Sequence, residues 1–408
     1  MKLDLTDTLY VLSFALDAVE SDLLGIDTGH NRRVAYLALL MGREAGFSDE
    51  ELRDFVGCCL MHDNALTEFI HEELVFDNYR TLPLSEMNRR DEVLMNLHHS
   101  ILGERNIHML PFKTDVRNII QYHHENADGT GALKRTASQT SLKSQILHLA
   151  DTVDISRSLM SMQAAEFGNI QNWVKDNSGK RFSQEAVDLF LRAVSFDDIV
   201  YLQTNDVHSF FRQALSTSPC DYTNEEVRNI ADFFAEIVDY KSEFTNSHSR
   251  SVADKAKLMA RYYGFDSEKT IRFYFAAALH DIGKMIVSND VFDGPMNFIP
   301  GVDEMKNHAS ATHKVLSKLE GIPDIVNWAS NHHEKLNGTG YPRGLTEKDL
   351  SFEDQLLACI DVYQDLTEEK PPYKDGMSHA QAIAKMLEMA RNGELSEKIV
   401  RDISKVIN

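Results

Sequence analysis

The sequence contains few of the residues that interrupt regular secondary structure, with 9 prolines and 20 glycines among 408 residues. This scarcity favours a helical protein over a turn-rich β protein. No apolar run approaches the roughly 18 residues that indicate a transmembrane helix. Residues 1–22 mix acidic and apolar side chains and lack a basic region, so we expect no signal peptide.

Cysteine is also scarce, and its spacing matches neither a disulfide framework nor a C-x-x-C metal motif. The four cysteines are Cys58, Cys59, Cys220 and Cys359. Reduced thiols in a cytoplasmic protein are therefore expected.

Positive charge is in short supply, with 42 Lys and Arg against 63 Asp and Glu and a formal net charge of −21. Such a surface repels nucleic-acid polymers and anionic membranes, so neither is expected as a partner. A small phosphate-bearing substrate is compatible with this charge if bound metal ions supply positive charge locally.

Apolar residues recur with a period near 3.6 over most of the chain, whereas strand-like alternation is rare. We therefore predict an all-α protein. The predicted helices include residues 5–21, 28–45, 49–61, 84–102, 141–160, 183–214, 224–240, 247–263, 269–279, 322–333 and 356–366.

The two halves of the chain share an ordered set of histidines and aspartates. The matching positions are His30 with His248, His62–Asp63 with His280–Asp281, His99 with His308, His123–His124 with His332–His333, and Asp151 with Asp361. The offset is 218 (248 minus 30) for the first two and 209 or 210 for the others (308 minus 99, 361 minus 151). Constant order and near-constant offset predict an internal duplication. We expect two tandem helical bundles, over 1–160 and 220–408, joined by a helical connector over 161–219.

The C-terminal set contains five imidazoles and two carboxylates, too many for one tetrahedral zinc. It suits two adjacent divalent ions with mixed nitrogen and oxygen ligands, which favours iron or manganese. Asp281, directly after a histidine, can bridge the two ions. Two ions activate a hydroxide and stabilise both the attacking and leaving oxygens at phosphorus. The set therefore predicts a metal-dependent phosphodiesterase, whereas isolated histidines such as His208 and His379 are read as ordinary structural ones.

Two further features concern the substrate. Lys284 follows the His280–Asp281 pair by one turn, so its ammonium can reach a phosphate oxygen, and a solvated surface lysine is the alternative. Gly283 indicates that some group approaches closely there. The loop at 337–345 carries Tyr341, which either shapes a base or ribose pocket or packs on the core.

The segments HDIGK at 280–284 and HHEKLNGTGYP at 332–342 resemble the HD-GYP family, a branch of the HD phosphohydrolases that hydrolyses bacterial cyclic dinucleotides. The resemblance covers about residues 220–408. It implies a phosphate contact at Lys284, catalytic roles for Asp281 and Lys284, and a signature loop at Gly340, Tyr341 and Pro342. It also implies metal ligation by His248, His280, Asp281, His308, His332, His333 and Asp361.

The chain departs from the family pattern at several positions. Phe244 occupies the place of a glutamate that binds a third metal in some members, so two metals are expected. Gln364 replaces the second aspartate of the family's DVYDALT segment. The family's RPY reads Lys-Pro-Pro-Tyr here, and Lys370 and Lys374 are the cations expected to reach phosphate, without the bidentate fork of arginine.

The N-terminal half resembles a degenerate copy of the same domain. The HDIGK lysine is replaced by Leu66, and the GYP segment reads Gly131-Ala132-Leu133. Metal binding there is plausible and catalysis is not expected, so we predict a regulatory or scaffolding role. The candidate ligands are His30, His62, Asp63, His99, His123, His124 and Asp151.

Two such units in tandem resemble the bacterial 3′3′-cyclic GMP-AMP phosphodiesterases. This favours linearisation of 3′3′-cGAMP to a 5′-phosphorylated dinucleotide, with cyclic di-GMP as the alternative substrate. Two other interpretations are a non-catalytic dinucleotide sensor or adaptor and a hydrolase of another phosphate substrate. Duplication also makes an intramolecular pseudo-dimer natural, with a homodimer as the alternative.

Overall fold

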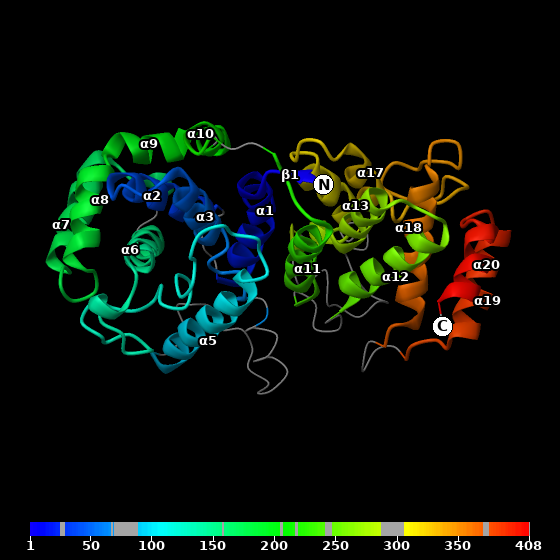
Figure 1. Ribbon diagram of the computed structural model, residues 1–408, viewed down its shortest axis with the longest axis horizontal. Helices are drawn as coiled ribbons and strands as arrows, with labels where there is room; N and C mark the ends of the chain where they lie inside the picture. Colours follow the sequence, from blue (N-terminus) through cyan, green and yellow to red (C-terminus); the bar gives the residue numbers. More distant parts are fainter. Residues whose placement is uncertain are drawn as a thin grey trace. The chain divides into compact units, whose positions relative to one another are not determined.

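The computed structural model describes residues 1–24, 29–66, 68, 89–156, 159–204, 207–216, 219–240, 247–286, 306–369 and 375–407. The predicted all-α class is confirmed (Figure 1). Within the described ranges, extended structure is limited to isolated bridges and one sheet of two short strands, β1 (Lys2–Leu3) and β2 (Cys220–Asp221). The chain divides into two compact units, one formed by Asp4–Cys220 and the other by Asp221–Asn408 together with Met1–Leu3.

The N-terminal unit is built around the helix that begins with His30. Helix α2 (His30–Glu44) packs against α3 (Asp49–Leu60) and α6 (Leu142–Ser156). Helix α3 begins at a capping box, in which Ser48 and Glu51 satisfy each other's backbone N–H groups. This unit also contains α1 (Leu5–Leu24) and α5 (Arg89–Ile107), with short 3₁₀ turns at Ala137–Gln139 and Leu159–Ser161.

The segment predicted as a connector forms four helices, and these pack in the N-terminal unit. They are α7 (Ala164–Asp176), α8 (Gln184–Ala193), α9 (Phe196–Thr204) and α10 (Val207–Ala214). Helix α8 packs on α2 and α6, and α10 packs on α1 and α2. Buried aromatic side chains such as Phe190 and Phe211 anchor them in the core.

The prediction of a single helix over 183–214 is wrong, because α8 ends at Ala193 and a new helix begins at Phe196. Val194 is extended, with φ −108° and ψ 121°. Ser195 then starts a new helix, since its N–H donates to Asp198 Oδ2 (2.8 Å) and its hydroxyl accepts from the Asp198 N–H (3.4 Å). The serine at this position is an N-cap rather than a point on one continuous amphipathic face.

The C-terminal unit repeats the central arrangement. Helix α12 (His248–Tyr262) packs against α13 (Ser267–Ala278) and α18 (Phe352–Thr367). Helix α13 also contacts α11 (Asn224–Tyr240) and α17 (Pro323–Ser330). The unit further contains the 3₁₀ turn η4 (Ile282–Ile286), α16 (Asn307–Leu316), α19 (His379–Arg391) and α20 (Glu397–Val406).

The tandem arrangement predicted from the repeated histidines is therefore present in the fold. Each unit has a helix that begins with a candidate ligand, α2 or α12, and packs on one that ends just before a His–Asp pair, α3 or α13. In each unit the last candidate aspartate lies in a third helix, which packs against the helix that begins with the candidate ligand. This third helix is α6, packed on α2, in the N-terminal unit and α18, packed on α12, in the C-terminal unit. None of the described helices has the length and apolar character needed to cross a membrane.

Candidate metal centre

Five segments of the C-terminal unit bring seven ionisable side chains together, and we call this set the C-terminal centre. His248 begins α12, His280 and Asp281 follow α13, and His308 lies in the first turn of α16. His332 and His333 follow α17, and Asp361 lies within α18. The structure thus brings together all seven residues singled out in this half: His248, His280, Asp281, His308, His332, His333 and Asp361.

The Asp281 carboxylate lies between two pairs of imidazoles. Its Oδ2 is 3.3 Å from Nε2 of His280 and 3.8 Å from Nε2 of His248. Its Oδ1 is 3.4 Å from Nε2 of His308 and 3.7 Å from Nε2 of His332. Each oxygen of this carboxylate therefore faces a different pair of imidazoles.

Asp361 and His333 complete the centre. Asp361 Oδ1 is 3.2 Å from Nε2 of His248 and 3.4 Å from Nε2 of His280. Its Oδ2 is 3.8 Å from Nδ1 of His333. Within the centre, two groups of three residues can each be distinguished by the closeness of their donor atoms, which lie within 4.8 Å of one another. The first group is His248, His280 and Asp281, and the second is His308, His332 and His333.

Outer hydrogen bonds fix the orientation of the imidazoles. Nδ1 of His280 donates to the carbonyl oxygen of Ala277 (2.7 Å), and Nδ1 of His332 donates to that of Ala329 (2.6 Å). These bonds place the protons on Nδ1 and leave Nε2 as the ligand atom. The backbone turn after each helix therefore selects the tautomer that binds a metal.

The donors of the centre fit divalent cations. Within the described part of the chain, Nε2 of His280 and Oδ1 of Asp281 are buried and have no hydrogen-bond partner. Leaving a polar group buried and unsatisfied costs about 1–3 kcal/mol. Two cations between the imidazoles and carboxylates would satisfy both atoms, and a donor set rich in nitrogen suits first-row transition metals.

The electrostatics of the centre also favour cations. Burial alone would raise the pKa of the Asp281 carboxyl, but His280 and Lys284 lower it well below its usual range. Burial lowers the pKa of His332 well below its usual value, so that imidazole is neutral. For His280, burial opposes protonation, yet the Asp281 and Asp361 carboxylates outweigh it and raise the pKa to about 10. A cation bound at Nε2 of His280 would displace that proton.

Lys284 lies beside the centre, as the sequence predicted. Its ammonium forms an ion pair with Oδ2 of Asp281, and its side chain is 22% exposed. Burial acts to lower the pKa of this lysine, but the Asp281 carboxylate overrides burial and raises it above the usual range. This lysine therefore keeps its positive charge beside Asp281.

Gly283 is in close contact with α16, which is the close approach that its position predicted. Its N–H donates to Oγ1 of Thr312 (3.0 Å), whose hydroxyl donates to the carbonyl oxygen of His280 (2.8 Å). Thr312 was not singled out from the sequence, and nothing in its local pattern distinguishes it from other helix positions. It ties the His–Asp turn to the helix that carries His308.

Tyr341 lies at the edge of the centre rather than in the hydrophobic core. Its ring centroid is 4.7 Å from the imidazole of His333 and 6.4 Å from that of His308. The Tyr341 N–H donates to the carbonyl oxygen of His333 (3.2 Å). A Cβ on Gly340 would stand 2.6 Å from that same carbonyl oxygen, so only glycine lets the loop fold back this closely.

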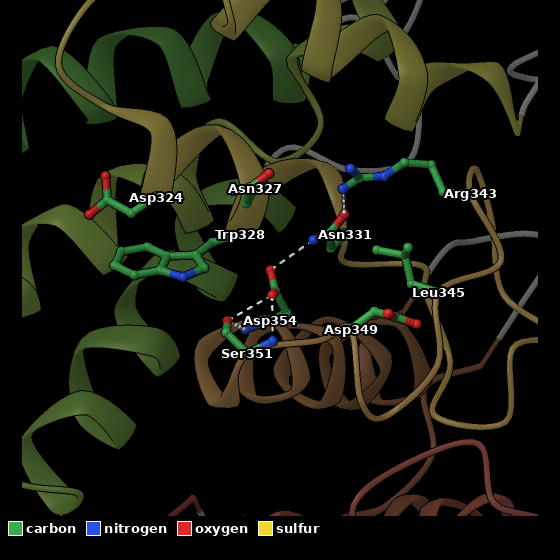
Figure 2. A pocket seen from close by; sticks show the side chains of 9 residues that line it. All are labelled: Asp324, Asn327, Trp328, Asn331, Arg343, Leu345, Asp349, Ser351 and Asp354. Atoms are coloured by element: carbon green, nitrogen blue, oxygen red, sulfur yellow. Dashed lines mark hydrogen bonds between the residues drawn. The ribbon is translucent and has the colours of Figure 1, made fainter.

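A chain of hydrogen bonds behind the centre connects the signature loop to the helix that carries Asp361 (Figure 2). The Arg343 guanidinium donates to Oδ1 of Asn331, whose amide donates to Oδ1 of Asp354 (3.0 Å). Asp354 also accepts from the N–H of Ser351 (2.8 Å) in the cap of α18. These residues line a polar pocket of about 430 Å³ with Trp328 on one wall.

The N-terminal unit contains the same arrangement, which we call the N-terminal centre. Asp63 Oδ2 is 3.4 Å from Nε2 of His62 and 4.0 Å from Nε2 of His30. Asp63 Oδ1 is 3.4 Å from Nε2 of His99 and 4.0 Å from Nε2 of His123. The structure brings together the full predicted set: His30, His62, Asp63, His99, His123, His124 and Asp151.

The N-terminal donors fit cations by the same criterion. Nδ1 of His62 donates to the Cys59 carbonyl oxygen (2.9 Å), and Nδ1 of His99 donates to that of Met95 (2.7 Å). Nε2 of His62 and Oδ1 of Asp151 are buried without a hydrogen-bond partner among the described residues. The two centres therefore share imidazoles that are oriented by backbone carbonyls and buried donor atoms that lack a hydrogen-bond partner among the described residues.

The two centres differ in the groups that would face a substrate. Leu66, which is 3% exposed, occupies the place of Lys284. The loop still folds in the same way, because Glu125 accepts backbone N–H groups from Leu133 (2.8 Å) and Arg135 (2.6 Å), as Glu334 does in the C-terminal loop. It lacks a tyrosine, so the anchoring of the loop is retained without its aromatic side chain.

Two predicted phosphate contacts, Lys370 and Lys374, lie outside the described residues, as does Phe244. The signature loop, in contrast, is described in full. Glu368, close to the first of these lysines in sequence, was not singled out from the sequence. Its carboxylate accepts from Nδ1 of His248 (3.0 Å).

Comparison with known proteins agrees with this architecture. The family model HD domain matches residues 28–156, and a second HD domain model matches residues 232–398. The chain is 26% identical to 3′3′-cGAMP-specific phosphodiesterase 1 of Vibrio cholerae over 97% of this chain and 90% of that protein.

Two other relatives match about two fifths of the chain. 3′3′-cGAMP-specific phosphodiesterase 3 of V. cholerae is 37% identical over 39% of this chain and 35% of its own length. A cyclic di-GMP phosphodiesterase of Pseudomonas aeruginosa is 30% identical over 40% of each chain. The crystal structure of a V. cholerae cyclic GMP-AMP specific phosphodiesterase shares the fold, with a TM-score of 0.65 and 22% identity over 100% of this chain and 98% of that one.

The fold, the paired centres and both family matches define a protein with two HD domains in tandem. The chain belongs to the HD-GYP branch of the HD-domain family, with the complete HDIGK and GYP motifs in its second domain and a degenerate copy in its first.

Proposed function

We propose that this chain is a metal-dependent cyclic dinucleotide phosphodiesterase of the cytoplasm that linearises 3′3′-cGAMP in its C-terminal unit. The observation that carries the proposal is the placement of Asp281 between two groups of imidazoles with the Lys284 ammonium against it. Two ions, with iron or manganese favoured, would be held by the C-terminal centre. They would supply an activated water and neutralise charge on the phosphoryl oxygens.

Four side chains have proposed roles in addition to metal binding or in support of it. His280 and His332 are held by backbone carbonyls, so their ligand nitrogens are positioned before substrate binds. Lys284 adds a fixed positive charge next to Asp281, where a phosphoryl oxygen gains negative charge during hydrolysis. Tyr341 presents an aromatic face beside His333, on which a purine base can stack.

The preference for 3′3′-cGAMP is supported by a likeness that spans both domains. The V. cholerae protein named a 3′3′-cGAMP-specific phosphodiesterase matches 97% of this chain, whereas the cyclic di-GMP phosphodiesterase of P. aeruginosa matches 40%. Cyclic di-GMP is the alternative substrate. The product is a linear dinucleotide with a 5′ phosphate.

For the N-terminal unit we propose a regulatory role that depends on metal. The N-terminal centre keeps the donors but has Leu66 at the place of the phosphate lysine, so it can hold ions without turning over a cyclic dinucleotide. The test is the full-length variant His62→Ala/Asp63→Ala. We expect it to lose N-terminal ions, measured by mass spectrometry of bound metal, and to change the maximal rate of the C-terminal unit. An unchanged rate would refute regulation, and an unchanged metal content would refute the second centre.

The main test is turnover. Protein loaded with Mn²⁺ or Fe²⁺ is incubated with 3′3′-cGAMP and with cyclic di-GMP, and products are separated by chromatography. We expect metal-dependent linearisation, faster for 3′3′-cGAMP and absent from His280→Ala/Asp281→Ala. Binding of either dinucleotide without turnover would support a sensor or adaptor, and hydrolysis of another phosphate substrate alone would support a different hydrolase.

A further inference from the structure

The first histidine of each centre is held by a carboxylate, but the carboxylate comes from different sequence positions in the two units. Nδ1 of His30 donates to Asp154 (2.7 Å), three residues after the candidate ligand Asp151. The equivalent position after Asp361 is Gln364, which is uncharged. Nδ1 of His248 donates instead to Glu368 (3.0 Å), four residues after Gln364, at the C-terminal cap of α18.

A cation in the C-terminal unit also comes from four residues later, although its hydrogen bond is to Gln364 rather than to Glu368. In the N-terminal unit, Arg33 grips Asp154 with two hydrogen bonds of 2.7 and 2.8 Å. The residue equivalent to Arg33 is Ser251. The C-terminal cation is Lys255, four residues later, and its ammonium donates to Oε1 of Gln364 (2.6 Å). Four residues are about one helical turn, so Lys255 lies on the same face of α12 as Ser251, and Glu368 lies one turn after Gln364 at the end of α18.

We propose that Glu368 is the positioning residue for His248, and that it takes the part of the aspartate absent at Gln364 by acting from the C-terminal cap of α18. This proposal rests on the proposed function, because it assigns Glu368 a role toward a bound metal. The Glu368 side chain is 10% exposed, and that of His248 is 4% exposed, so water competes little for their hydrogen bond.

The physical effect is on the opposite side of the imidazole. A carboxylate on Nδ1 fixes the ring orientation and increases the basicity of Nε2, which faces Asp281 and Asp361. The main-chain carbonyls on His280 and His332 orient their rings but carry no net charge. Within the C-terminal centre, Glu368 therefore adds negative charge from outside the ligand set.

The test measures metal affinity rather than turnover. The background is full-length His62→Ala/Asp63→Ala, which removes N-terminal donors, and free Mn²⁺ is followed by electron paramagnetic resonance during titration. In this background we compare Glu368→Ala, the double variant Glu368→Ala/Gln364→Asp, and the control Glu369→Ala at the exposed neighbouring residue. We expect Glu368→Ala to weaken Mn²⁺ binding by about 10–100-fold. Gln364→Asp restores most of that affinity, because it recreates the geometry of Asp154.

Each outcome decides the proposal. Loss and rescue with no effect of Glu369→Ala support it. Unchanged affinity in Glu368→Ala overturns it while leaving the metal centre intact. Weakened affinity that Gln364→Asp does not rescue also overturns it, because Glu368 would then act on the end of α18 rather than on Nδ1 of His248. A background protein that binds no Mn²⁺ at the C-terminal centre refutes the proposed function itself, and this proposal with it.

Discussion

Gly283 lies against the carbonyl oxygen of His308 so closely that a Cβ at position 283 would collide with that oxygen. The same Cβ would stand 2.6 Å from the backbone nitrogen of Thr312. Both obstacles belong to the backbone of α16, so no side-chain rotation relieves them. The contact holds the turn of Asp281 against the helix of His308, the two elements that meet across the C-terminal centre.

Gly283→Ala should therefore displace α16 and separate the two groups of imidazoles. We expect a loss of stability of about 1–3 kcal/mol, as for other overpacked sites, together with weaker Mn²⁺ binding. Thermal unfolding and metal titration measure the two effects. Gly168→Ala is the matched control, because a Cβ there meets nothing within 4 Å. A variant with normal metal affinity would contradict the role of this contact.

Lys284→Leu recreates in the C-terminal unit the residue found at Leu66. We expect kcat to fall by about 100-fold or more, because a charge aimed at the developing negative charge is removed. The bound metal should remain, since the seven ligand-type side chains are intact. Chromatographic rates and metal analysis separate these effects, with Lys348→Leu at an exposed position as the control. Wild-type turnover in Lys284→Leu would exclude a catalytic role for this ammonium.

Tyr341→Ala should weaken substrate binding more than it slows the chemical step. Stacking of a base on an aromatic ring contributes about 1–3 kcal/mol, so KM should rise by roughly tenfold or more. Tyr341→Phe keeps the ring beside His333 and should retain near-normal KM. Initial rates over a range of 3′3′-cGAMP concentrations make the comparison. An equal rise of KM in both variants would assign the effect to the hydroxyl instead.

Asp239 gives a prediction for pH. Burial raises the pKa of this carboxyl to about 6, although the N–H groups of Ser249 and Arg250 donate to it at the start of α12. The folded state therefore binds a proton more tightly than the unfolded chain. The resulting stabilisation is complete below the unfolded pKa of about 3.9 and disappears as pH rises through 6, a change of about 3 kcal/mol.

Asp239→Asn removes this titration. We expect the free energy of unfolding of metal-free protein to decline less steeply between pH 4 and about 6.5 in the variant than in the wild type. Urea titrations at several pH values in the presence of a chelator provide the measurement. Parallel curves for the two proteins would show that Asp239 does not titrate in this window.

The sequence predicted the inner donors of both centres because duplication placed the same residues in the same order twice. His99 and His308, for example, were matched by offset alone, and the structure places each beside the aspartate of its own His–Asp pair. The histidines outside the set, such as His208, were read as structural, and His208 stacks on Tyr10 with ring centroids 4.3 Å apart.

The surrounding contacts were harder to predict, because they depend on distances between helices. Glu368 became a partner of His248 only once α12 and α18 were packed together. Thr312 bonds to two backbone groups of a distant turn, and hydrophobic periodicity carries no information about such bonds. The break at Ser195 was missed for a local reason, since its apolar neighbours continue the helical period while its hydroxyl caps a new helix.

The N-terminal centre bears on the history of the chain. Burying a cluster of imidazoles and carboxylates lowers stability compared with an apolar core of the same volume. A duplicated domain that needed only to fold would be expected to lose such a cluster by drift, as it has lost the lysine at Leu66 and the tyrosine of its loop. Its seven donors persist around Asp63 in the geometry of the second copy. The two copies therefore differ in the groups that would face a nucleotide and share the donors that would face an ion.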